Sequence, residues 1–246
     1  MKLITTSWDD GHPLDFRLAE LLNKYSLSGT FYIPKTNAEH EVMSPQHVAE
    51  LAKEFEIGGH TISHIRLHTT DEKVLEYEIA GSRQWLSDLI GYEPQSFCFP
   101  GGVFHQKAID VVFKSGYKIA RTTELMSIDT HTSQGLVPTT LQVYEHKSFT
   151  YAKHLVKRRR WTNLLHWLQS YSLYKLPALT ESYLNRIAKD GGCFHLWRHS
   201  WEIEEFDLWA KLEELFRVLS ERDDFLYVPN KDLLTMNSKQ QLHTIQ

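Results

Sequence analysis

Residues 2–11 read KLITTSWDDG, an apolar run that ends in two carboxylates and a glycine. Its short length and β-branched residues predict a buried strand, and the glycine permits a sharp turn at the exit. Leu14, Leu18, Leu21 and Leu22 follow at helical spacing. A strand followed directly by a helix is the repeating unit of α/β proteins, so this stretch indicates the fold class.

The same alternation of strand and helix continues along the chain. Further strands are predicted at GTFYIP, FEIGGH, SFCFPGG, YKIARTT, LVPTTLQV, GGCFHLWRH and FLYVP. Seven or eight such units with parallel strands predict a barrel of the TIM type. The length of 246 residues suits one large domain, and no clear linker or internal repeat interrupts it. The sequence therefore predicts a single domain over residues 1–246.

The composition excludes some classes of function. The net charge of −4 gives no electrostatic basis for binding nucleic acid. No apolar run approaches the ~20 residues of a membrane span, and no apolar signal core follows Met1. Cys98 and Cys193 lie in apolar runs and are predicted to be buried thiols in a reducing compartment rather than a disulfide. We therefore expect a soluble cytoplasmic protein.

A helical insertion is predicted near residues 144–189, where the rhythm of strands breaks. It contains KHLVKRRRWTNLLHWLQSYSLYKL, in which basic residues accompany an apolar helix face. One interpretation is a helical hairpin packed on the barrel, because charge runs beside an apolar face are usually a solvated helix surface. The other is a weak contact with a membrane surface through residues 153–168.

Two acidic residues, Asp9 and Asp10, end the first predicted strand. In a β/α barrel, side chains at the carboxyl ends of the strands face the active-site mouth. One carboxylate there can bind a metal ion while the other takes a proton from water. Asp-Asp-Gly is also common in ordinary turns, so the motif alone leaves both interpretations open.

Histidines form the second group of candidates. His60 and His64 stand at i and i+4 in HTISH, a spacing that can present two imidazoles to one metal but also occurs in surface pairs. The late strand ends in FHLWRH, where His199 lies at the exit and is the catalytic candidate. His195 is predicted to be a buried barrel histidine with a hydrogen-bond partner. Trp201 either lines the mouth or packs within its loop.

These motifs occur together and in this order in the polysaccharide deacetylase superfamily (NodB homology, carbohydrate esterase family 4-like), which the chain resembles. TSWDDG is similar to that family's T-F-D-D-G, and HTISH matches H-[ST]-x-x-H. FCFPGG looks like the R-x-P-[YF]-G strand end, and FHLWRH resembles the last motif, which supplies a histidine. The resemblance implies an α/β fold, a distorted TIM-like (β/α) barrel that is commonly seven-stranded.

The resemblance also implies roles for single residues. Asp9 matches the family's general base, and His199 matches its general acid. Asp10, His60 and His64 match its metal ligands. The implied cofactor is a divalent metal, with zinc favoured for nitrogen and oxygen ligands and cobalt, nickel or manganese as alternatives.

The third motif is only partly retained. Pro100, Gly101 and Gly102 are expected to bind substrate together with Trp201, and a backbone N–H of this turn is expected to help stabilise an oxyanion.

Two departures from the family pattern accompany this turn. Cys98 stands where many members have an arginine that orients the base aspartate. Arg121 could reach the same site from the next strand. The fourth motif, an Asp with a Trp, has no clear match.

The implied function is metal-dependent removal of acetyl groups from a glycan or sugar-containing substrate, with N-acetyl favoured over O-acetyl. Two alternatives stay open. One is a hydrolase of the same superfamily that acts on another non-peptide C–N bond in a small molecule. The other is a non-catalytic glycan-binding protein, for which the missing arginine at Cys98 is the best support.

Overall fold

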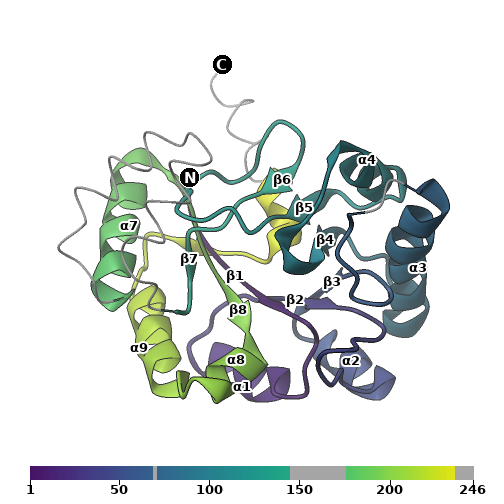
Figure 1. Cartoon of the computed structure of the whole chain (residues 1–246). Coiled ribbons are helices and arrows are strands. Elements are labelled where there is room, and N and C mark those ends of the chain that lie inside the picture. Colours follow the sequence, from purple (N-terminus) through teal and green to yellow (C-terminus); the bar gives the residue numbers. More distant parts are fainter. Residues whose placement is uncertain (69–70, 145–175, 236–246) are drawn as a thin grey trace.

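A curled parallel sheet forms the centre of the computed structural model, which describes residues 1–68, 71–144 and 176–235 (Figure 1). The strands are β1 (Lys2–Asp9), β2 (Thr30–Ile33), β3 (Glu56–Gly59), β4 (Ser96–Cys98), β5 (Ile119–Arg121), β6 (Leu136–Val137), β7 (Leu141–Gln142), β8 (Gly192–His199) and β9 (Leu226–Tyr227). The α-helices are α1 (Asp15–Lys24), α2 (Pro45–Leu51), α3 (Glu72–Ile90), α4 (Gln106–Lys114), α7 (Leu176–Asp190), α8 (Ser200–Glu205) and α9 (Trp209–Ser220).

The strand order is β6-β5-β4-β3-β2-β1-β8-β7, and every recorded pairing is parallel. β6 and β7, at the two ends of this path, are separated along the chain only by residues 138–140. They act as two halves of one extended stretch that joins β5 to β8 around the barrel. If these halves are counted as one position, seven positions surround the axis, and the predicted distorted barrel is confirmed.

β9 pairs with the same edge of β1 as β2 does. β8 pairs with β1 along Lys2–Asp9, so β2 and β9 must share the other edge of β1. β2 pairs with residues 7–9 and β9 with residues 3–4. β1 and β2 therefore diverge towards the amino ends of the strands, and β9 fills the gap.

Side chains of β1 alternate between the barrel interior and the helical layer. Ile4 and Trp8 belong to the main hydrophobic core, where the Trp8 ring meets Phe216 of α9 edge-on at 5.9 Å. Ser7 and Asp9 point the other way, where they bond to side chains of β8 and β5. The interior is therefore polar near its carboxyl-end mouth, while the apolar core lies between the sheet and its helices.

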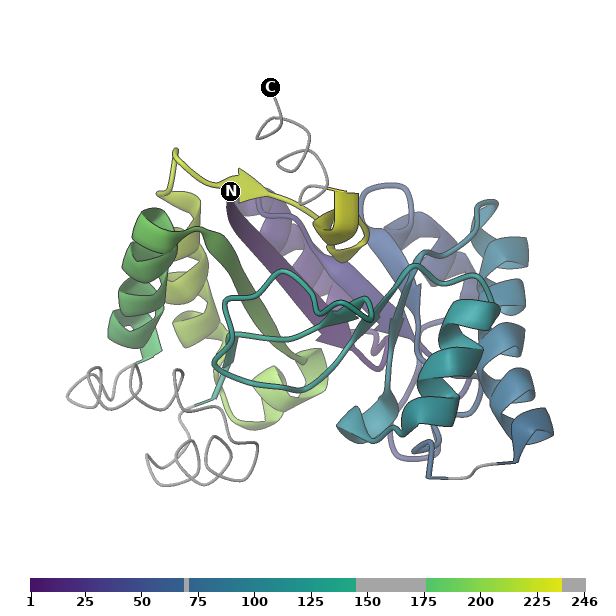
Figure 2. The same ribbon diagram turned by 90° about the horizontal axis from the view of Figure 1, so that it is seen from above.

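The helices begin and end at residues that suit those positions. The Ser44 side chain accepts a hydrogen bond from the His47 N–H at the start of α2, and Pro45 takes the first helical position. Asp71 caps α3 in the same way, and Gly91 ends it with φ of 79°. Figure 2 shows α3 beside α4 on one side of the molecule and α7 beside α9 on the other.

The predicted insertion near residues 144–189 is only partly described. Its last part is α7, which packs on β8 and α9 and contributes buried residues to the main core, so it belongs to the barrel wall. Residues 145–175, including the basic segment 153–168, lie outside the described residues. Among the helices that are described, none is long and apolar enough to cross a membrane.

We predict opposite effects for two glycine substitutions. A Cβ at Gly59 would lie 2.0 Å from the hydroxyl of the buried Tyr117, so Gly59→Ala should lower the free energy of unfolding by about 1–3 kcal/mol. Gly81 lies within α3, where a Cβ makes only ordinary contact with Ile62 at 3.4 Å. Gly81→Ala should therefore raise stability by about 0.5–1 kcal/mol. Urea denaturation measures the free energy of unfolding of both variants. Equal changes in the two variants would contradict the packing of β3 described here.

Candidate active site

The chain turns sharply at the carboxyl end of β1, where two buried carboxylates follow one another. Asp9 is the last strand residue, and Asp10 and Gly11 follow with φ of 76° and 60°. A Cβ at Gly11 would lie 2.7 Å from the Ile33 side chain, so both the positive φ and the close approach require glycine. The turn therefore presents Asp9 and Asp10 to different neighbours at the mouth of the barrel.

Asp10, His60 and His64 converge on one point. Their ligand atoms all lie within 4.8 Å of one another. Asp10 Oδ1 is 3.5 Å from His60 Nε2 and 2.9 Å from His64 Nε2. Two ligands ~2.0–2.2 Å from one tetrahedral zinc ion are about 3.3–3.6 Å apart, so the His60 spacing fits and His64 would recede slightly.

The hydrogen bonds around His60 and Asp10 fit a metal ion as well. His60 Nδ1 is 2.8 Å from the carbonyl oxygen of Cys98, so this nitrogen carries the proton and Nε2 is left with a lone pair. Buried Asp10 Oδ1 makes no well-aligned hydrogen bond, although His64 Nε2 lies 2.9 Å away. Burial would raise the pKa of Asp10, but its polar contacts with His60 and His64 hold that pKa well below the usual range. A cation between the carboxylate and the two imidazoles would satisfy all three groups.

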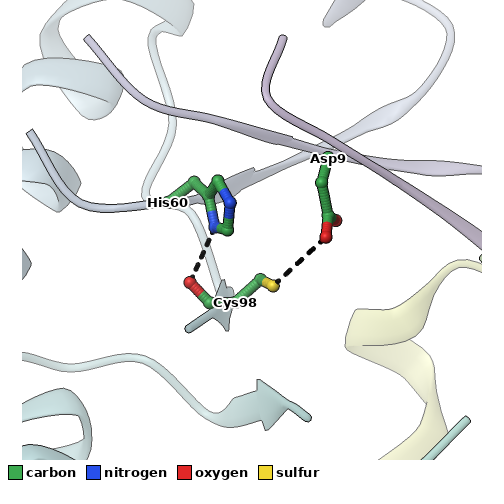
Figure 3. A group of neighbouring side chains, drawn as sticks. All are labelled: Asp9, His60 and Cys98. Carbon is green, nitrogen blue, oxygen red and sulfur yellow. Dashed lines mark hydrogen bonds between the residues drawn. The ribbon is translucent and has the colours of Figure 1, made fainter. Parts of the chain in front are cut away.

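A second possible ligand set shares His60 with the first. Asp9, His60 and Cys98 also lie within metal-binding reach of one another, as Figure 3 shows. Cys98 is buried, which raises the pKa of its thiol well above the ordinary value, and its Sγ–H lies 3.8 Å from Asp9 Oδ2 as a weak donor. Asp9 is already paired with the guanidinium of Arg121. A neutral thiol and an adjacent fixed cation disfavour a metal ion here, so the Asp10 set is the better candidate.

Arg121 lies where the missing third-motif arginine would be needed. Cys98 on β4 and Arg121 on β5 are register partners, and the Arg121 Nη2 donates to Asp9 Oδ1. Arg121 is fully buried, and its guanidinium stacks 4.6 Å from the Trp197 ring centre. Burial would lower the pKa of Arg121, but the charge of Asp9 raises it. The position of Asp9 is thus fixed from the strand next to the one predicted by the motif.

His199 leaves the end of β8 directly opposite Asp9. The two residues are register partners, and His199 Nε2 lies 3.9 Å from Asp9 Oδ2 and 3.9 Å from Asp10 Oδ2. His199 Nδ1 is hydrogen-bonded to the carboxylate of Glu202, in the first turn of α8. Burial lowers the pKa of His199, but the Glu202 hydrogen bond and the two aspartates outweigh this effect and raise it. The geometry therefore favours a protonated imidazole that faces the carboxylate pair.

His195, the other histidine of β8, has a structural environment. Its Nε2 lies 2.8 Å from Ser7 Oγ and its Nδ1 lies 3.0 Å from the Pro138 carbonyl. Burial, with the nearby charge of Arg121, lowers the pKa of His195 to about 3. The prediction of a buried, hydrogen-bonded barrel histidine is confirmed.

Trp201 has a role that its sequence position did not reveal. Its indole N–H donates to Asp10 Oδ2 at 2.9 Å, so it holds the aspartate of the candidate metal set. Its ring also stacks between His199 and His40, with ring centres 5.3 Å and 3.8 Å away. Trp201 therefore belongs to the mouth, and its expected contact with substrate stays a prediction.

The turn at Pro100–Gly102 follows β4, as the third motif predicted. Gly101 and Gly102 have φ of 62° and 65°, and a Cβ on Gly102 would lie 2.0 Å from Thr123 Oγ1. The Gly102 N–H donates to the Phe99 carbonyl within the turn at 2.9 Å. Gly102 N–H is therefore committed to the turn, and the role of this segment in binding substrate stays a prediction.

Glu78 is a site residue that the sequence analysis did not identify. It lies buried on α3, and its Oε2 accepts hydrogen bonds from the backbone N–H groups of Ile62 and Ser63, both at 2.9 Å. These residues stand between the two candidate histidine ligands. The sequence signal for Glu78 was an acidic residue on the buried face of a helix. The sequence alone does not show which loop Glu78 contacts, because that contact arises from tertiary packing.

Taken together, the fold and site define a class of protein, a β/α barrel that gathers two aspartates and three histidines at the carboxyl ends of its strands. Comparison with known proteins then shows which family the chain resembles. Residues 1–120 match the sequence model of the polysaccharide deacetylase family. The resemblance to the polysaccharide deacetylase superfamily is thereby confirmed.

Among curated proteins, a peptidoglycan-N-acetylglucosamine deacetylase of Bacillus cereus is 28% identical over 129 residues, which are 51% of this chain and 57% of the relative. The chain spans about half the length of the curated relatives that it matches.

Two solved structures share the fold over nearly the whole chain. A candidate polysaccharide deacetylase from Mycobacterium smegmatis has a TM-score of 0.68 at 14% identity, covering 98% of this chain and 92% of its own. A family 4 acetyl xylan esterase from Clostridium thermocellum, in complex with a cobalt ion, has a TM-score of 0.60 at 16% identity, covering 96% and 92%. At these identities the likeness concerns the fold.

We predict that Glu78 supports both stability and metal binding. Glu78→Ala leaves two buried N–H groups without an acceptor, which should cost about 2–4 kcal/mol of unfolding free energy. Metal affinity should fall about 10–100-fold, because the histidine loop loses its support. The matched control is Glu76→Ala on the same helix, where an exposed ion pair with Lys114 should contribute less than about 1 kcal/mol. Equal metal affinity in both variants, measured by zinc titration, would refute the role of Glu78.

Proposed function

We propose that this protein is a metal-dependent hydrolase that removes acetyl groups from a glycan, with N-acetyl groups favoured over O-acetyl. One observation carries the proposal: the Asp10, His60 and His64 set lies at the same mouth as the Asp9–Arg121 pair and His199. The activity of the curated relatives, peptidoglycan-N-acetylglucosamine deacetylases, supports this choice of substrate class.

Asp10, His60 and His64 are the proposed metal ligands. A divalent cation, with zinc favoured, would supply Lewis-acid chemistry there, polarising the acetyl carbonyl and acidifying water. Three protein ligands leave a coordination position open, as catalytic sites require. The cobalt ion in the Clostridium thermocellum esterase supports a divalent metal at a site of this fold.

Asp9 is the proposed general base. Its Oδ1 is held by Arg121, which leaves Oδ2 to take a proton from the attacking water. As the water oxygen bonds to the acetyl carbon, its proton moves to Asp9. Arg121 fixes the orientation of the carboxylate, so the base is positioned before substrate arrives.

His199 is the proposed general acid. The Glu202 carboxylate holds Nδ1, and the protonated Nε2 faces the space beside Asp9 and Asp10. When the C–N bond breaks, its electron pair stays on the nitrogen, which takes the proton from His199. The products are acetate and a free amine on the sugar. The turn at residues 100–102 and the Trp201 ring are the proposed contacts for the substrate around this centre.

We predict that base, acid and metal ligand can be separated by single variants. Asp9→Asn and His199→Ala should each keep the metal and slow acetate release by ~10²–10⁴-fold, the usual contribution of an acid–base group. Asp10→Ala should lower metal content itself. Elemental analysis and acetate release from chitooligosaccharides or peptidoglycan fragments measure both properties.

The outcomes separate the alternatives. If Asp9→Asn emptied the site and Asp10→Ala did not, the two aspartates would have the opposite roles. If the wild-type protein bound metal but released acetate only from small amides, it would be a small-molecule hydrolase. Binding of glycan with no acetate release would make it a non-catalytic glycan-binding protein.

A second prediction concerns Arg121, which contacts Asp9 from β5. Arg121→Cys should leave Asp9 buried without its cation and lower kcat by about 10–100-fold, with the metal retained. Because Cys98 and Arg121 are register partners, exchanging them in a Cys98→Arg/Arg121→Cys variant should recover most of the loss. Cys98→Arg alone buries a second guanidinium and should lower the melting temperature. No recovery in the exchanged variant would show that Arg121 does not act by orienting Asp9.

A further inference from the structure

Arg198 is a buried charged residue next to the proposed acid. It precedes His199 on β8, and its side chain is 4% exposed. Trp197 faces the interior, where it meets Arg121, so Arg198 points to the opposite face of the strand. Its guanidinium lies 4.9 Å from the ring centre of Tyr144 and 5.9 Å from that of Phe206. Such a position is costly for a charge unless it has a partner.

One partner of Arg198 is the carboxylate that also binds His199. Arg198 Nε lies 3.0 Å from Glu202 Oε2, and the same oxygen accepts the hydrogen bond of His199 Nδ1. α8 begins at Ser200, so its first turn carries Glu202 back over both residues that precede the helix. One carboxylate oxygen thus joins a guanidinium on the outer face of the strand to an imidazole at the mouth.

We propose that Arg198 is a positioning residue for the general acid, acting through Glu202. This inference rests on the proposed function. Glu202 is 18% exposed, and without the guanidinium its carboxylate is free to turn towards solvent. His199 would then lose the contact that keeps Nε2 directed at the space beside Asp9 and Asp10.

The chemistry of the leaving group gives a readout that a merely structural role would not change. An amine leaves only as its nitrogen takes a proton, which His199 supplies while the C–N bond breaks. The phenolate of 4-nitrophenyl acetate leaves without a proton, so hydrolysis of that ester does not need the acid. Loss of a residue that positions the acid should therefore slow hydrolysis of the amide but not hydrolysis of the aryl ester.

The experiment compares Arg198→Met with wild type on chitooligosaccharides and on 4-nitrophenyl acetate. We expect kcat on the amide to fall about 10–100-fold, within the ~10²–10⁴-fold that a general acid contributes. KM, metal content and kcat on the ester should stay within about twofold. The matched control is Arg217→Met, which removes another i,i+4 arginine–glutamate pair on an exposed helix face and should change neither rate.

A double-variant cycle tests whether Arg198 acts through Glu202. In a Glu202→Gln background, Arg198→Met should cause no further loss on the amide. Independent, multiplying losses would overturn the proposal, as would equal losses on amide and ester. If Arg198→Met fails to fold, Arg198→Lys keeps the buried cation but loses the Nε contact and must show the same selective loss on the amide. Wild-type protein that releases acetate from neither substrate would instead refute the proposed function.

Discussion

The register between β1 and β8 is the constraint on which the site depends. These strands pair over eight consecutive residues, and the last pair joins Asp9 to His199. A shift of one residue would turn every side chain of β1 to the opposite face. Asp9 would then point into the helical layer and Trp8 into the polar interior. The proposed base and acid are therefore neighbours because the largest strand pairing in the sheet fixes them, and the loops after each strand only adjust their orientation.

The mouth contains several buried charged groups, and two pairings of opposite charge organise it. Asp9 is paired with Arg121, and Glu202 is shared between Arg198 and His199. Buried ion pairs add little net stability, but removing one partner is costly, so each pair holds its members in place. Asp10 Oδ1, in contrast, makes no well-aligned hydrogen bond. Its neighbours are the Nε2 atoms of His60 and His64, and a cation would satisfy this oxygen together with the two imidazoles.

The sequence was sufficient to predict the barrel and the residues at its mouth. Alternating strands and helices gave the fold, and three motifs located Asp9, Asp10, His60, His64 and His199. The partners of these residues could not be predicted, since they arise from contacts between elements. Arg121 reaches Asp9 because β4 and β5 pair in one register, and Glu78 reaches the histidine loop because α3 packs beneath it. A search for the missing arginine along the sequence motif alone finds Cys98. The structure instead has Arg121 of the neighbouring strand in contact with Asp9.

Backbone strain explains why those partners are needed. Asp10, Thr61 and His64 all have left-handed backbone conformations, with φ between 54° and 76°, at a cost of about 1–3 kcal/mol each. Glu78 supports the loop of Thr61 and His64 with two hydrogen bonds, and the Trp201 indole holds Asp10. Such conformations persist only where the surroundings determine them, which here means a helix and an aromatic side chain outside the motifs. The motifs supply the ligands, whereas α3 and α8 supply the contacts that aim those ligands at a common point.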